Sequence, residues 1–279
     1  MVRSIPKINR TVLGGGVVIF LLLFLIIGTL IAVVFRIESF SGLTRNEWLA
    51  IRFTFFQSFA SAFISVLLAI PVSRALSRRT FIGRKILITL LGAPFILPVI
   101  VAILGLVLVF GNNGLIRNLF HLDALSIYGV HGVIIAHVFF NLPLATRLLL
   151  QGWVSIPSER FRLAQSLGFT PFNFFVYLEL PMLRRIVPGT FLIIFLICTT
   201  SFAVALALGG GPKSTTIELA IYQAFRFDFN LSRLAILSVI QITICGVIAL
   251  FSLWASIPVN YGGGLDRVRP QSSNGRAID

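Results

Sequence analysis

Long apolar stretches alternate with short polar segments along most of the chain. Six of these stretches reach about 20 residues, the length that an α-helix needs to cross the hydrocarbon core of a membrane. The predicted spans cover about 12–35, 48–71, 86–110, 130–150, 186–208 and 231–257. The pattern therefore predicts an all-α membrane protein with six transmembrane helices.

A basic flank precedes the first apolar stretch, as it does in a secretory signal peptide. The apolar run is longer than a typical signal-peptide core, and no small-residue cleavage site follows it. We therefore expect the first span to be retained as a helix.

Lysine and arginine residues are concentrated in alternate loops. Fifteen lie before the first span, between the second and third, between the fourth and fifth, and after the sixth, whereas five lie in the other loops. Positive charge marks the cytoplasmic loops of multi-pass proteins. Both termini and the segment between the fourth and fifth spans are therefore predicted to be cytoplasmic.

The composition agrees with a lipid-embedded protein: 57% of the residues are hydrophobic, 11% are charged, and the mean hydropathy is +0.98. A net charge of +14 can also indicate nucleic-acid binding. Here the basic residues are spread over short loops, so membrane topology explains them and no nucleic acid is expected. Cys198 and Cys245 lie within apolar runs and are interpreted as free thiols.

The polar segment between the fourth and fifth spans has the pattern of two short helices. Ser158 is the expected N-cap of the first helix, and Glu159 in its first turn favours the positive end of the helix dipole. Gly168 suits the C-terminal stop. An apolar stripe is expected from residues at every third position, namely Phe161, Ala164 and Leu167.

The second helix is predicted to begin at Thr170 as its cap, with Pro171 in its first position, and to end at Pro181. An amphipathic helix pair at a membrane surface can lay its apolar face into a groove on a partner protein. A solvated loop that only joins two spans fits the same pattern, so both interpretations stay open at this point.

This segment resembles the signature loop of permease subunits of binding-protein-dependent ABC importers. That signature reads Glu-Ala-Ala, three residues, Gly, nine residues, and Ile-x-Leu-Pro. Ala164, Gly168, Leu178 and Leu180-Pro181 match it at every spacing, whereas Arg162 stands where the Glu is usual. The resemblance implies the type I fold of ABC importer permeases, with a coupling-helix loop that docks on a cytoplasmic ATPase. The residues expected to carry this contact are Glu159, Arg162, Ala164, Leu167, Gly168, Leu178, Leu180 and Pro181.

The resemblance covers about 48–257, and its region 208–228 is most similar to the first half of thiamine importer permeases and more loosely to ferric-iron permeases. Those permeases usually fuse two halves in one chain, whereas this chain has the length of one. The resemblance implies thiamine as the substrate. Ferric iron, sulfate-type anions and polyamines stay open, because a separate binding protein usually selects the substrate. Three parts are expected: an N-terminal segment with the first span (1–47), a permease core (48–257) and a cytoplasmic polar tail (258–279).

Polar residues inside spans are costly in lipid and often functional. The candidates for a hydrated translocation pathway are Gln57, Ser61, Thr200, Ser201 and Gln241. Helix packing is the alternative, because Ser and Thr commonly lie between close helices or bond back to their own backbone.

The segment after the fifth span begins with Gly209-Gly210-Gly211-Pro212, which we expect to break that helix. Thr215 and Glu218 form a Thr-x-x-Glu pattern, so a capping box and a short outer helix over about 216–225 are predicted. This helix is expected either to form a rim that meets a binding protein or simply to close the fold.

Enzymatic chemistry finds no support in the residues. The three histidines, His121, His131 and His137, form no metal-binding motif, and the sequence contains neither a Gly-x-Ser-x-Gly nucleophile motif nor a Walker A run. We therefore expect no catalytic residues, metal or cofactor on this chain, with ATP bound by separate ATPase subunits. The other expected partners are a periplasmic or lipoprotein substrate-binding protein, a second permease half (this chain or a similar one) and the lipid of a bacterial inner membrane. A membrane anchor or assembly subunit without transport is the alternative of another class.

Overall fold

The computed structural model describes residues 10–38, 42–111, 114–116, 127–209, 211, 214–255 and 271–272. The long helices are α1 (Arg10–Val34), α2 (Arg45–Arg78), α7 (Val130–Val154), α10 (Leu180–Thr199) and α13 (Leu231–Ala255). The shorter helices are α3 (Arg84–Leu90), α4 (Ala93–Ile96), α5 (Val99–Phe110), α8 (Ser158–Ser166), α9 (Pro171–Phe174), the π-helix η1 (Phe175–Glu179), α11 (Phe202–Leu208) and α12 (Ile217–Arg226). Two short strands, β1 (Arg79–Thr80) and β2 (Gln271–Ser272), pair in parallel. The all-α membrane fold is confirmed.

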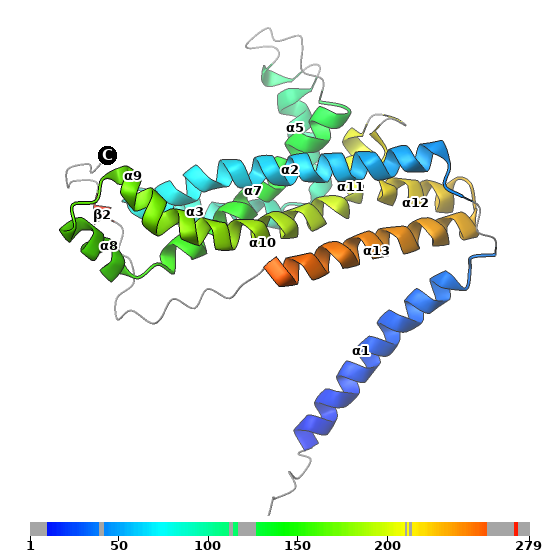
Figure 1. The fold of residues 1–279 in the computed structure, drawn as a ribbon. Helices are drawn as coiled ribbons and strands as arrows, with labels where there is room; N and C mark the ends of the chain where they lie inside the picture. Colours follow the sequence, from blue (N-terminus) through cyan, green and yellow to red (C-terminus); the bar gives the residue numbers. More distant parts are fainter. Residues whose placement is uncertain are drawn as a thin grey trace, which may run out of the picture.

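Helices α2, α7 and α10 pack side by side, and α13 lies along α10 (Figure 1). Their shared core contains small residues such as Ala62 and Ala145 beside the large side chains of Trp153 and Ile194. Gly152 of α7 shows how closely the helices approach, because a Cβ there would lie 2.2 Å from Ile186 Cδ1 of α10. A second core cluster joins α5, α7 and α11.

The prediction of a continuous third span over 86–110 is wrong. In the structure this stretch is divided into α3, α4 and α5. Pro94 lies at the start of α4, and Pro98 is the N-cap of α5. Proline lacks the N–H that a continuing helix needs and clashes with the preceding turn. Among the described residues, five helices are long and apolar enough to cross a membrane, with α5 as a shorter apolar helix, so the count of six spans is not confirmed.

The predicted boundaries of the fifth span also differ from the structure. Pro181 does not end the loop helix, because α9, η1 and α10 form one helical run from Pro171 to Thr199. The π turn immediately before Pro181 changes the hydrogen-bond ladder where the proline ring would clash with it. At its other end the helix stops at Thr199 rather than continuing to 208, and the Gly209 run ends the separate helix α11.

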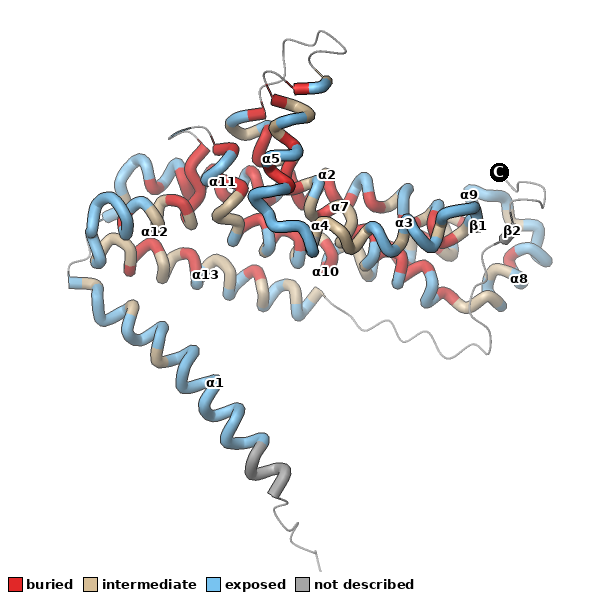
Figure 2. Tube along the Cα trace, turned by 180° about the vertical axis from the view of Figure 1, so that it is seen from behind, coloured by how far each residue is buried: buried red, intermediate tan, exposed pale blue. Residues whose placement is uncertain are grey.

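Helix α1 is almost entirely exposed from Gly15 to Val34 (Figure 2). It diverges from the bundle and contacts α13 (Figure 1). Its apolar side chains include Phe20, which is 67% exposed, and Phe24, which is 65% exposed. Apolar surface of this extent is expected of a helix surrounded by lipid or by another membrane subunit.

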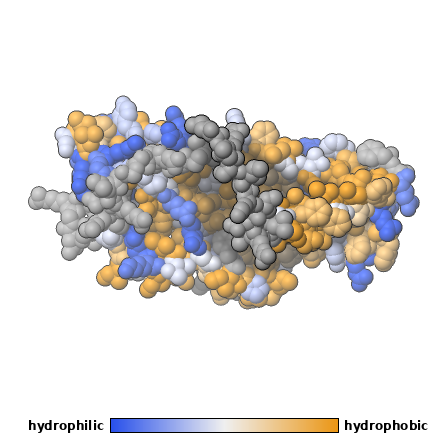
Figure 3. All heavy atoms as spheres, turned by 90° about the horizontal axis from the view of Figure 1, so that it is seen from below, coloured by the Kyte–Doolittle hydropathy of each residue, from blue (hydrophilic) through white to orange (hydrophobic). Residues whose placement is uncertain are grey.

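The two ends of the bundle differ in character. The loop helices α8 and α9, the end of α2 and strand β2 lie together at one end, whereas α12 lies at the other (Figure 1). Hydrophilic residues concentrate toward the ends of the face shown in Figure 3, with hydrophobic residues over much of the length between them. Two of the segments predicted to share one side of the membrane, the one between α2 and α3 and the one between α7 and α10, therefore lie at the same end of the molecule.

Candidate functional site

The loop between α7 and α10 is folded into two short helices joined by a tight turn. Helix α8 ends in a Schellman motif, in which the Phe169 amide donates to the Ala164 carbonyl oxygen and the Gly168 amide donates to the Gln165 carbonyl oxygen, each at 3.0 Å. Gly168 has φ 69°, the left-handed conformation that glycine adopts most easily. The predicted stop at Gly168 is confirmed.

The starts of the two helices differ in how well the sequence predicts them. Pro157, not Ser158, is the N-cap of α8, and no side chain caps it. Ser158 lies inside the helix as its first residue and therefore differs from the predicted cap. Thr170 caps α9 as predicted, because its hydroxyl accepts from the Asn173 amide at 3.3 Å, with Pro171 in the first turn.

Helix α8 does not have the single apolar stripe that the sequence predicts. Ala164 is buried and Phe161 is half-buried, whereas Leu167 is 65% exposed and its neighbour Leu163 is 62% exposed. The helix therefore has an inner face against the bundle and an outer face that combines two leucines with polar side chains. Glu159 and Arg162 are exposed on α8, Leu178 and Leu180 are half-buried further along, and Pro181 is exposed.

A cluster of aromatic rings holds the loop together. Phe161 of α8 stacks on Phe174 of α9 with ring centroids 6.4 Å apart, and Phe169 lies edge-on to Phe174 at 6.0 Å. The guanidinium of Arg78, at the end of α2, lies 4.6 Å from the centroid of Phe161 and 5.8 Å from that of Phe174. The rings and the cation thus join α8, α9 and α2 in one contact.

Glu179, the last residue of η1, is the partner of this arginine. Its carboxylate is fully buried, accepts from Arg74 Nε at 2.7 Å and forms a second ion pair with Arg78. From the sequence, Arg74 and Arg78 are only markers of the cytoplasmic side, and Glu179 has no assigned role. Their spacing of four residues on α2 was the available signal, because it places both side chains on one helical face.

Two glutamines from different helices meet the end of α10. Gln57 Nε2 donates to the Cys198 carbonyl oxygen at 2.9 Å, and Gln241 Nε2 donates to the Thr199 carbonyl oxygen at 3.1 Å. The last carbonyls of a helix have no partner within it, so these amides act as side-chain caps from α2 and α13. Both glutamines are buried, at 0% and 5% exposure.

The other pathway candidates are divided between the interior and the surface. Ser61 is buried, with its hydroxyl 3.5 Å from His137 Nδ1 of α7. Thr200 is exposed directly after the end of α10 and bonds back to the Leu196 carbonyl oxygen at 3.2 Å, and Ser201 beside it is half-buried. The structure therefore assembles Gln57 and Gln241 around the break after α10, places Ser61 against α7, and leaves Thr200 facing outward.

The outer helix α12 is present, but its predicted cap is shifted. Thr216, not Thr215, is the N-cap of α12, and its hydroxyl accepts from the Leu219 amide at 3.3 Å. Glu218 makes no capping box, and burial raises the pKa of its carboxyl group above the usual value. Gly210 and Pro212 of the preceding run, like His121 and most of the 258–279 tail, lie outside the described residues.

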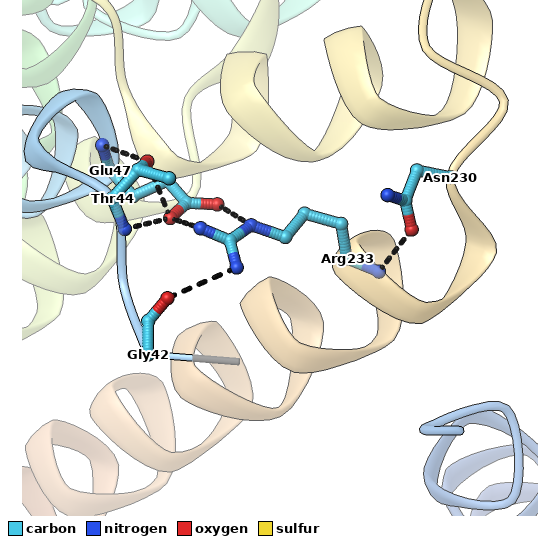
Figure 4. A network of polar contacts seen from close by, with 5 residues as sticks. All are labelled: Gly42, Thr44, Glu47, Asn230 and Arg233. Carbon is cyan, nitrogen blue, oxygen red and sulfur yellow. Dashed lines mark hydrogen bonds and ion pairs between the residues drawn. The ribbon is translucent and has the colours of Figure 1, made fainter. Parts of the chain in front are cut away.

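A second pairing of arginine with glutamate lies at the α12 end of the bundle (Figure 4). Arg233 of α13 forms a bidentate ion pair with Glu47 of α2. It also donates a hydrogen bond to the Gly42 carbonyl oxygen at 3.2 Å. Glu47 in turn accepts from the Thr44 amide at 2.7 Å, which completes the capping box that starts α2. The start of α13 is thereby fixed to the start of α2.

The described residues contain no group of three or more His, Cys, Asp or Glu side chains placed to hold a metal ion. Two other arrangements stand out among the described residues. An ordered helix pair is fixed to α2 at one end of the bundle, and a break in the helical run after α10 is capped by side chains from its neighbours.

Comparisons with known proteins give this arrangement a context. No protein-family model matches the sequence. The thiamine transport system permease protein ThiP of Salmonella typhimurium is 46% identical over 209 residues, which are 74% of this chain and 39% of that protein. The corresponding protein of Haemophilus influenzae is 36% identical over 271 residues, which are 93% of this chain and 50% of that protein. The chain thus spans half the length of these relatives or less.

Solved structures agree on the fold. A chain in the crystal structure of a bacterial alginate ABC transporter, in complex with a periplasmic protein bound to an alginate pentasaccharide, superposes with a TM-score of 0.73. The match covers 92% of this chain and 98% of that chain at 16% sequence identity. The chain is therefore homologous to thiamine transport system permease proteins and has the fold of ABC importer permease subunits.

Proposed function

We propose that the chain is a transmembrane permease subunit of an ATP-driven importer, in which it forms half of the substrate pathway. The observation that carries this proposal is the ordered pair α8–α9, which presents Leu163 and Leu167 with polar neighbours on its outer face while its inner face is fixed to the bundle. A loop that only joined two spans would need neither the Schellman turn nor the ion pairs of Glu179.

The proposed mechanism is alternating access. A cytoplasmic ATPase dimer docks on α8, and its closure upon ATP binding draws the loops of two permease halves together. The spans then open outward to receive substrate, because a ligand that favours one arrangement shifts the population toward it. ATP is bound on the ATPase subunits, and the second half is another copy of this chain or a similar permease.

We propose thiamine as the substrate, supplied by a periplasmic or lipoprotein binding protein. The support is the sequence identity of 46% and 36% to permeases named for thiamine transport. Ferric iron, a sulfate-type anion or a polyamine are the alternatives for the same machinery. The site of action is the bacterial inner membrane, with both termini and the α8–α9 loop on the cytoplasmic side, as the distribution of arginines favours.

The experiment is to purify the tagged chain from its native cells in mild detergent and to identify the proteins that copurify. An ATPase and a substrate-binding protein are expected, and the complex reconstituted in liposomes should take up radiolabelled thiamine only when ATP is supplied. Failure to recover an ATPase would favour a membrane anchor without transport. Recovery of the complex with no thiamine uptake, but with uptake of iron, sulfate or a polyamine, would correct the substrate alone.

A further inference from the structure

The loop formed by α8, α9 and η1 (158–179), here called the coupling loop, is attached to a helix that lies far from it in sequence. Glu179 pairs with Arg74 and Arg78, which precede it by 105 and 101 residues. A fully buried carboxylate is tolerated only when it is paired and hydrogen-bonded, so the position of Glu179 is tied to that of α2. The arginines keep 42% and 34% of their side chains exposed.

The same arginines contact every element of the loop. Arg78 lies on the rings of Phe161 in α8 and Phe174 in α9, and the guanidinium of Arg74 lies 5.8 Å from the ring centroid of Phe175 in η1. A planar guanidinium can pair with a carboxylate and stack on a ring at the same time, which an ammonium group does less well. A displacement of α8 therefore acts on α2 directly, without passing through the covalent connection to α10.

Helix α2 is suited to carry such a displacement. It is the longest helix in the described structure, with 34 residues, and it runs the length of the bundle (Figure 1). Between its two ends Gln57 donates a hydrogen bond to the last turn of α10, and near its first residue Glu47 pairs with Arg233 of α13. One continuous helix, with Pro71 between Arg74 and Gln57, thus contacts the coupling loop, the break after α10 and the α12 end of the bundle.

We infer that Glu179 is a positioning residue for coupling, which transmits the movement of α8 to α2 through Arg74 and Arg78. The inference rests on the proposed function. It assigns to α2, rather than to α10 alone, the first response of the membrane domain to ATPase closure.

The test uses the complete complex of permease, ATPase and binding protein in lipid nanodiscs and liposomes. Glu179→Gln keeps the shape of the side chain and removes its charge. We expect the variant to retain its ATPase subunits and its basal ATP hydrolysis, while thiamine uptake per ATP hydrolysed falls about fivefold or more, the lower range of typical coupling between sites. Glu179→Asp, which keeps the carboxylate, should recover part of the ratio.

The matched control is Glu38→Gln, the same change at an exposed glutamate far from the loop in sequence, which should leave the ratio unchanged. A purely structural role would lower the yield and the thermal midpoint but not the uptake per ATP of the folded complex. Arg78→Lys is the second variant, for use if Glu179→Gln fails to assemble. It keeps the positive charge but loses the planar stacking group, and it should also lower the thiamine uptake per ATP hydrolysed.

The outcomes separate the two proposals. Normal uptake per ATP in both Glu179→Gln and Arg78→Lys would overturn the role of Glu179 and leave the proposed function standing. Loss of folded protein in both variants would also overturn the role of Glu179, since its ion pairs with Arg74 and Arg78 would then serve stability alone. A wild-type complex without an ATPase would refute the proposed function itself.

Discussion

Replacing Gly168 separates the conformation of the coupling loop from its contact with a partner. Gly168 has φ 69°, and a Cβ built there meets no atom within 4 Å. A methyl group therefore has room there, and the left-handed backbone is the penalty that Gly168→Ala carries. For a residue with a Cβ this penalty is about 1–2 kcal/mol, with a smaller value for Asn, which tolerates that conformation.

The penalty should appear as faster hydrogen exchange at two amides. Phe169 and Gly168 donate the hydrogen bonds that close the turn, and both bonds open when the turn opens. A cost of about 1–2 kcal/mol raises the open population roughly 5- to 30-fold. Gly168→Ala and Gly168→Trp should lose protection at these amides by about that factor, and Gly168→Asn by less.

The affinity for the ATPase then distinguishes Gly168→Ala from Gly168→Trp. Gly168→Trp places a large side chain on open surface, so its affinity for the ATPase should fall well below that of Gly168→Ala, although both variants carry the same penalty for the left-handed backbone. Equal affinities would show that this surface lies outside the interface. Unchanged amide protection in Gly168→Ala would refute the backbone argument.

Three further predictions concern the membrane domain, each checked by thermal unfolding in detergent. Gly152→Ala should destabilise the protein by about 1–3 kcal/mol, because the new methyl group would lie 2.2 Å from an α10 side chain. Gly105→Ala, where the space is open, should instead stabilise it by about 0.5–1 kcal/mol. A change in stability of the same sign at both positions would contradict the packing of α7 against α10. Glu47→Gln should cost about 1.5–3 kcal/mol by weakening the hydrogen bonds from Arg233, and a midpoint equal to that of the parent would argue against the pair. Gln241→Leu should cost about 1–3 kcal/mol by leaving a buried carbonyl without its donor, and an unchanged midpoint would show that this cap is dispensable.

The sequence predicts local features well where one residue decides them. Gly168 and Thr170 each have a role set by their own conformation or hydroxyl group, and both are confirmed. The Thr-x-x-Glu spacing occurs both at Thr44 and at Thr215, and only the second was singled out from the sequence. The structure forms a capping box at Thr44 and shifts the α12 cap to Thr216, because local spacing alone does not say which threonine adopts the extended cap conformation.

Features that depend on a distant partner were not predictable. Pro181 predicts the end of a helix, yet a π turn in the preceding residues lets the helix continue. From the sequence, Gln57 and Gln241 are predicted to be pathway residues. Nothing in the sequence shows that both donate hydrogen bonds to the carbonyl groups at the end of α10. Their part in a pathway stays a prediction, as do the contacts of the coupling loop, because both require a second subunit.

The break after α10 has a consequence for the mechanics of the bundle. Bending an intact helix requires hydrogen bonds of its ladder to open, each in a setting where water cannot replace them. Between Thr199 and Phe202 the helical run is already interrupted, and the carbonyl groups of Cys198 and Thr199 bond sideways to neighbouring helices. A change in the angle between α10 and α11 would therefore break no ladder hydrogen bond of either helix, and the side chains that it would strain are those of Gln57 and Gln241.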